Sequence, residues 1–182
     1  RGSLFHEIQT VFFRTLMTNG MLPLMPGHAA GARGQLDWAI NAVTRTAYDD
    51  LAPAIDRVWN DEIGGLRRDL KLWFDEMVVT DAAQWVPERF ELAFGLPLDA
   101  ARDDRSVREP VEVGEARYRL RGSIDLVERR LSDRALRVTD HKTGRKPDRI
   151  EKAIIGGGAV LQPVLYAVAV QTALGRLVHH GR

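Results

Sequence analysis

The chain has 182 residues, a length that fits one domain with a helical elaboration. Hydrophobic residues make up 45% and charged residues 28%, as in an ordinary globular protein, and the net charge of +1 argues against a globally basic nucleic-acid binder. The absence of cysteine excludes disulfides, Cys-ligated zinc and an iron–sulfur cluster within this chain, so that any metal must be held by oxygen or imidazole ligands.

The two ends of the chain carry no targeting pattern that we recognise. Residues 1–9 are charged and lack the apolar core of a signal peptide. No apolar run reaches the roughly 18 residues of a membrane span, and we expect a cytoplasmic protein without membrane contact. The chain begins without Met and stops abruptly after residues 178–182, and we interpret it as a fragment of a longer protein.

Helices are predicted for the N-terminal half. Ser3 can cap a helix over about 4–18, and the Gly- and Pro-rich stretch 19–34 predicts a loop. Two further helices are predicted near 35–52 and 54–79. An apolar stripe on the second of these predicts core, as do the tryptophans at 38, 59, 73 and 85: the stripe comprises Ile55, Val58, Trp59, Ile63, Leu66, Leu70 and Phe74.

Strands are predicted after Pro87. Residues 90–94 form a short strand, 99–110 an exposed loop, and 117–126 alternate between apolar and polar side chains as a half-buried strand does. Ser132-Asp133 makes a turn before the paired strand 136–140, and an apolar helix covers about 159–174, with Pro163 in its first turn and Gly175 past its end. The order predicts an α/β or α+β fold with one mixed sheet.

Asp140 and Lys142 lie at the end of the second predicted strand, on the face of Leu136 and Val138. A carboxylate and an ammonium at the mouth of a buried face are costly unless they are paired or used. If these residues are considered alone, a plain Asp–Lys surface pair, where the strand runs into solvent, is the better explanation.

Asp125 strengthens the case, because a tight hairpin would bring it beside Asp140. Two carboxylates at one point repel each other unless a cation or a proton intervenes. Mg²⁺ takes one or two carboxylates together with waters and phosphate oxygens, and such an ion can lower the pKa of bound water. Lys142 would then orient or deprotonate the attacking water, or neutralise developing negative charge.

Two further features could contact nucleic acid. Gln162 and Tyr166 are four residues apart on the last helix, so they share a face that could hold phosphates or stack on a base, or could simply pack the helix on the sheet. Residues 117–152 hold twelve Lys or Arg against six Asp or Glu, which could contact phosphates or form a solvated surface.

Together these motifs resemble the RecB-type branch of the PD-(D/E)xK nuclease superfamily, which includes RecB-like and AddB-like nuclease domains. The resemblance covers most of the chain and implies the restriction-endonuclease-like fold, with 35–85 as a helical insertion in a single domain 1–182. It rests on five elements in this order: Gly2–Glu7 (GSLFHE), Pro87–Gly95 (PERFELAFG), Gly122–Asp125 (GSID), Val138–Gly144 (VTDHKTG) and Gln162–Tyr166 (QPVLY).

The resemblance implies a role for each matching residue. His6, Asp125 and Asp140 would bind Mg²⁺ or Mn²⁺, the backbone carbonyl of His141 would complete the ligand set, and Lys142 would be the catalytic lysine. The partner would be DNA, either single-stranded or at duplex ends, and a helicase domain or subunit would accompany the nuclease.

The remaining implied roles belong to the upstream acid and to the last helix. Glu91 would be an additional acid, with Glu88 as the alternative, and Gln162 and Tyr166 would position the DNA strand. Several relatives carry four cysteines for an iron–sulfur cluster, and this chain has none.

Two other functions compete with an exonuclease of DNA repair. The same fold can serve as a non-catalytic DNA-binding or scaffold module, although every ligand position and Lys142 are intact here. A nucleotide site at the glycines 156–158 is weaker, since no phosphate-loop lysine follows them.

Overall fold

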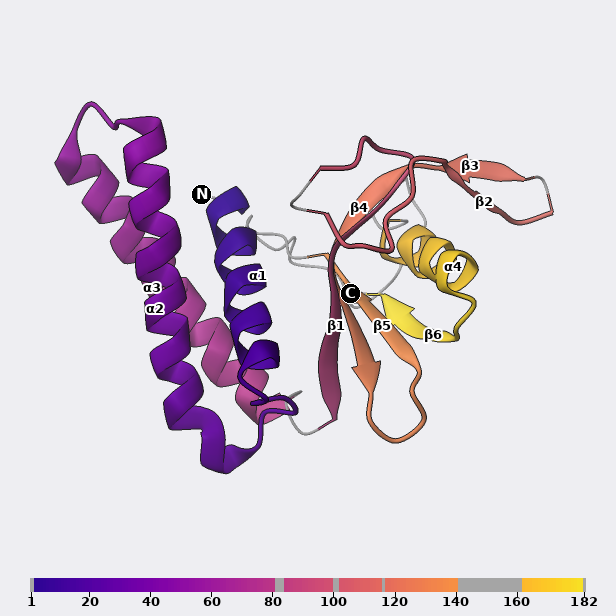
Figure 1. The fold of residues 1–182 in the computed structure, drawn as a ribbon, viewed down its shortest axis with the longest axis horizontal. Helices are drawn as coiled ribbons and strands as arrows, with labels where there is room; N and C mark the ends of the chain where they lie inside the picture. The colour runs from indigo at the N-terminus through magenta and orange to yellow at the C-terminus, as the bar shows by residue number, and fades with distance from the viewer. Residues whose placement is uncertain (1, 81–83, 100–101, 116, 141–161, 182) are drawn as a thin grey trace, which may run out of the picture. The chain divides into compact units, whose positions relative to one another are not determined.

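The computed structural model describes residues 2–80, 84–99, 102–115, 117–140 and 162–181. It divides into two compact units, residues 1–85 and 86–182 (Figure 1). None of the helices in these ranges is both long and apolar enough to cross a lipid bilayer. The prediction of a single domain with an insertion at 35–85 stays a prediction.

The N-terminal unit is helical. Its elements are α1 (Gly2–Thr18), the short 3-10 helix η1 (Pro26–His28), α2 (Ala29–Leu51) and α3 (Asp56–Thr80). The helices bury a shared apolar core, in which the Phe12 ring lies 5.9 Å from the Phe74 ring, edge to face. Three helices in this order confirm the predicted helical half of the chain.

Three predictions for this unit were wrong. The loop expected over 19–34 ends early, since α2 already begins at Ala29. Its buried positions Ala32, Leu36 and Ala39 keep helical spacing through this Gly-containing stretch, so packing outweighs the low helix propensity of glycine. The expected core residues Ile55, just before α3, and Val58, on α3, are 61% and 57% exposed, and they line an apolar groove of roughly 380 Å³ beside Trp59.

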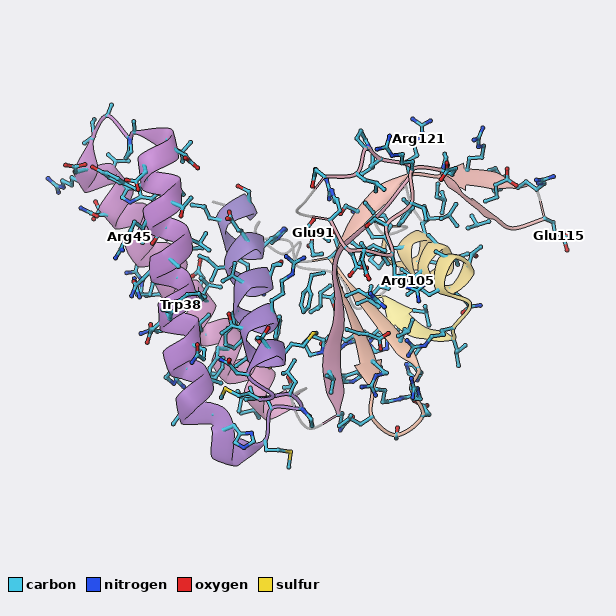
Figure 2. All side chains as sticks on the ribbon, in the orientation of Figure 1. Trp38, Arg45, Glu91, Arg105, Glu115 and Arg121 are labelled. Carbon is cyan, nitrogen blue, oxygen red and sulfur yellow. The ribbon has the colours of Figure 1, made fainter. Side chains whose placement is uncertain are left out.

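Trp38 was also expected in the core and is instead 54% exposed on α2 (labelled in Figure 2). The helix buries Leu36, Ala39 and Ile40 instead. A tryptophan on an amphipathic helix is therefore not a sufficient sign of burial here.

The C-terminal unit is a mixed sheet with a helix on it. The strands β1 (Trp85–Phe94), β4 (Gly122–Arg130), β5 (Leu136–Thr139) and β6 (Val178–Gly181) lie side by side in the order β1-β4-β5-β6. β4 and β5 are antiparallel, whereas β5 and β6 are parallel, and α4 (Gln162–Leu174) covers one face (Figure 1). This is the restriction-endonuclease-like fold that the sequence predicted.

The core of this unit lies between the sheet and α4. Its buried members come from four strands and the helix: Leu92, Phe94, Val111, Val113, Ile124, Val127, Leu136, Val138, Ala169 and Val170. Gly175 ends α4 with a φ of +62°, and its N–H bonds the carbonyl of Gln171, as the sequence predicted.

The strand boundaries differ from the sequence prediction in three places. β1 extends beyond the expected 90–94, and β6 was not expected at all. The strand expected over 117–126 is divided at Arg121: β3 (Tyr118–Leu120) pairs with β2 (Val111–Val113) in a separate ribbon, and β4 begins at Gly122. The alternation of side chains continues across this change of partner, so the pattern alone does not mark it.

Candidate active site

The hairpin of β4 and β5 brings Asp125 toward Asp140. The ladder pairs Leu126 with Thr139, and its next step sets Asp125 opposite Asp140. Residues opposite each other in an antiparallel pair have Cα atoms about 4.5–5.5 Å apart. Both aspartates are partly buried. The hairpin and its turn at 131–133 confirm the predicted pairing, and the two carboxylates share one edge of the sheet.

Glu91 supplies a further carboxylate from the neighbouring strand. One of its carboxylate oxygens lies within 4.8 Å of one from Asp125. Among the described residues, Asp140 does not belong to the group whose ligand atoms all lie within that distance of one another. Glu91 has a φ of +54°, in the left-handed region that non-glycine residues seldom adopt. Such positions persist only where the surrounding structure holds them, and they concentrate at functional sites.

The alternative acid, Glu88, is engaged elsewhere. Its Oε2 lies 3.1 Å from Nε of Arg129, and its Oε1 accepts a hydrogen bond from Nη1 of Arg176 at 2.5 Å. These ion pairs join β1 to β4 and to the segment after α4. The geometry therefore favours Glu91 over Glu88 as the acid beside Asp125.

The Arg102 guanidinium and the Ser123 hydroxyl hold the Glu91 carboxylate. Nη1 of Arg102 lies 3.1 Å from its Oε2 and donates to Oγ of Ser123 at 2.7 Å. The Ser123 hydroxyl in turn donates to the same Oε2 at 3.3 Å. Neither residue was assigned a role from the sequence: Ser123 lies within the GSID element, and Arg102 lies in a stretch expected to be an exposed loop.

The remaining predicted ligands lie in the N-terminal unit or outside the described residues. His6 lies on α1 in the N-terminal unit and is partly buried. His141 and Lys142 lie outside the described residues, as do the glycines 156–158. The assigned roles of His6, His141 and Lys142 stay predictions.

The carboxylates present fit a hard divalent cation. Mg²⁺ and Mn²⁺ take oxygen ligands, and adjacent carboxylates are mutually repulsive unless positive charge lies between them. Glu91 and Asp125 meet this requirement by distance, and the register of the hairpin brings the backbone of Asp140 close to that of Asp125. The donor set thus suits magnesium or manganese.

Gln162 and Tyr166 lie where α4 meets the start of β4. Nε2 of Gln162 donates to the Tyr166 hydroxyl at 3.0 Å, and the Tyr166 ring stands edge-on to Phe94 at 6.1 Å. A Cβ on Gly122 would lie 3.0 Å from Cε1 of Tyr166, so the glycine makes room for the ring. The pair therefore packs the helix onto the sheet, and its contact with DNA stays a prediction.

A buried ion pair ties together the two strands that carry the aspartates. Arg137 on β5 donates from Nε and Nη2 to the two oxygens of Glu128 on β4, both at 2.7 Å, and Oγ1 of Thr139 adds a bond of 3.1 Å. All three residues are at most 4% exposed. Since Glu128 pairs with Arg137 in the ladder, this contact fixes the register that sets Asp125 opposite Asp140.

Several arginines of the basic stretch 117–152 are already paired within the protein. Arg117 bonds Glu112, and Arg130 donates from Nε and Nη2 to Asp133 at 2.9 and 2.6 Å. The hydrogen bond from Arg130, helped by the Ala135 N–H, lowers the pKa of Asp133 from 3.8 to about 2. These pairs reduce the positive charge that this stretch offers to phosphates.

Comparison with known proteins agrees with this geometry. The family model described as "PD-(D/E)XK nuclease superfamily" matches residues 1–181. No curated protein and no solved structure matches the chain significantly.

Proposed function

The chain belongs to the PD-(D/E)XK nuclease superfamily, and we propose that it is a metal-dependent deoxyribonuclease of the RecB/AddB-like branch. The observation that carries this proposal is the group of carboxylates at one edge of the sheet. A carboxylate oxygen of Glu91 lies within 4.8 Å of one from Asp125, and we propose Asp140, which follows the strand paired with that of Asp125, as a further member. Such a group suits a nuclease that works with Mg²⁺ or Mn²⁺.

The proposed chemistry is hydrolysis of a phosphodiester. A divalent cation bound by these carboxylates would stabilise charge on the phosphate and acidify a water molecule. Asp125 and Asp140 would hold the cation, together with His6 and the carbonyl of His141. Lys142, which follows Asp140 by two residues, would orient the attacking water or neutralise developing charge.

The proposed substrate is DNA, as single strands or duplex ends. Tyr166 lies beside Gly122, three residues before Asp125, and Gln162 donates to the Tyr166 hydroxyl. A Tyr ring and a Gln amide can contact bases and phosphates. We propose an exonuclease module of a repair or recombination helicase–nuclease.

Digestion of labelled DNA tests the function. Purified protein is incubated with single- and double-stranded DNA in Mg²⁺, in Mn²⁺ and in chelator, beside the variants Asp140→Ala and Lys142→Ala. We expect digestion that requires the metal and is lost in both variants. Digestion that persists in both would reject the assigned site, and DNA binding without digestion by the unmodified protein would indicate a scaffold module instead.

A further inference from the structure

The segment after residue 102 runs along β1 at the position of Glu91. The Asp103 N–H donates to the Glu91 carbonyl at 3.2 Å, and the Val107 N–H donates to the Ala93 carbonyl at 3.0 Å. These backbone bonds attach the segment to the strand on both sides of residue 92. The backbone at Arg102 is therefore fixed next to the left-handed residue that carries the acid.

The Arg102 side chain uses this position to reach the carboxylate. Its Nη1 contacts Oε2 of Glu91 and Oγ of Ser123, and that hydroxyl donates to the same Oε2. The Arg102 and Glu91 side chains are each 25% exposed, so the contact is partly withdrawn from water. A guanidinium in such a contact is a directional donor, unlike a mobile surface cation.

The two oxygens of Glu91 are held unequally. Within the part of the chain that the structure describes, the hydrogen bonds from Arg102 and Ser123 both end on Oε2. A carboxylate held by one oxygen keeps the other in a defined direction. A carboxylate oxygen of Glu91 also lies within 4.8 Å of one from Asp125, as two ligands of one cation would.

We propose that Arg102, together with Ser123, is a positioning residue for metal binding. It holds Oε2 of Glu91, so that Oε1 is presented to a divalent cation shared with Asp125. This inference rests on the proposed function, because it assigns a supporting role at the same site. Partners that orient metal ligands change metal affinity by about 10–100-fold when they are removed.

The charge of Arg102 has an effect on metal binding that is opposite in sign to positioning. Arg102 carries a positive charge, which repels a divalent cation a few ångströms away. If charge repulsion were its main effect, removal of the guanidinium would tighten metal binding. The sign of the change in affinity therefore separates positioning from repulsion.

Mn²⁺ binding tests the proposal without recourse to activity. The concentration of free Mn²⁺ is followed by electron paramagnetic resonance during titration of the full chain and of its variants. We expect Arg102→Met to bind Mn²⁺ about 10–100-fold more weakly and Arg102→Lys to recover part of the loss. Ser123→Ala, which keeps the guanidinium, is expected to show a smaller loss.

Arg105→Met is the matched control. Arg105 lies three residues further along, is exposed and is labelled in Figure 2, so its removal takes the same charge from the same segment without touching Glu91. We expect an affinity within about twofold of the unmodified protein. Circular dichroism without metal checks the folding of each variant, and Ser123→Ala and Arg102→Lys carry the test if Arg102→Met does not fold.

Unchanged or tighter Mn²⁺ binding by folded Arg102 variants would overturn the positioning role. Asp125→Asn separates that failure from failure of the proposed function. If Asp125→Asn abolishes binding while the Arg102 variants retain it, only the positioning role is wrong. If Asp125→Asn binds Mn²⁺ as the unmodified protein does, the proposed metal site itself is wrong.

Discussion

Removal of Glu128 tests whether the buried ion pair sets the geometry of the site. Arg137 is 3% exposed and donates a hydrogen bond to each oxygen of Glu128 at 2.7 Å, so Glu128→Leu leaves a guanidinium buried without this carboxylate. Breaking such a pair costs about 3–5 kcal/mol of unfolding free energy. Because the pair is buried, solvent screening does not reduce this figure much.

Scanning calorimetry measures the effect. For a chain of this size, about 1 kcal/mol corresponds to roughly 2–4 °C in Tm, so the expected fall is about 6–20 °C. The double variant Glu128→Leu/Arg137→Met removes both charges and is expected within about 2 kcal/mol of the unmodified protein, since apolar replacement of a whole pair is often neutral. If Glu128→Leu alone stays within about 1 kcal/mol of the unmodified protein, the Glu128–Arg137 pair does not hold the two strands together as described.

Three further predictions follow from the same unit. Gly122→Ala places a Cβ 3.0 Å from the Tyr166 ring, and we expect the free energy of unfolding, measured in urea, to fall by about 1–3 kcal/mol. The fall should be smaller in a Tyr166→Leu background, and equal falls in both backgrounds would contradict this packing. Tyr166→Phe removes the hydroxyl that Gln162 contacts, and on the proposed function it raises the KM for single-stranded DNA more than it lowers kcat; a change in kcat alone would argue against a role in DNA positioning. The pKa of Asp133 is lowered from 3.8 to about 2 by Arg130, so the stability that Asp133 contributes is present above about pH 4 and is lost as the pH falls toward 2. The difference in unfolding free energy between the unmodified protein and Asp133→Asn should therefore vanish over that window. A difference that does not change with pH would contradict this assignment.

The sequence predicted the pairing at the centre of the site for a physical reason. Alternating side chains and a short turn specify a hairpin, and a hairpin has a register that sets Asp125 opposite Asp140. Glu91 lies beside Asp125 because β1 is the neighbour of β4 in the sheet, and no local sequence pattern predicts that neighbour. The family resemblance supplied that acid, and the geometry then favoured it over Glu88.

Other features depend on contacts between segments distant in sequence. Arg102 reaches Ser123 across 21 residues, so neither residue indicates the other in the sequence. Glu128 and Arg137 are ordinary charged residues on two strands, and only their inward-facing register shows that they are buried together. The strand β6 carries a His-His-Gly sequence with weak strand propensity, and its pairing with β5 forms it.

The dependence of DNA digestion on Asp125 and on a divalent metal is the decisive test of the proposed nuclease site. Release of labelled nucleotides is measured for the unmodified protein and for Asp125→Asn across a titration of Mg²⁺ and of Mn²⁺. We expect metal-dependent release by the unmodified protein and a loss of at least about 100-fold in Asp125→Asn, of the order seen when a key electrostatic group is removed from an active site. Equal release by both proteins, or release that persists in chelator, would contradict the proposed site.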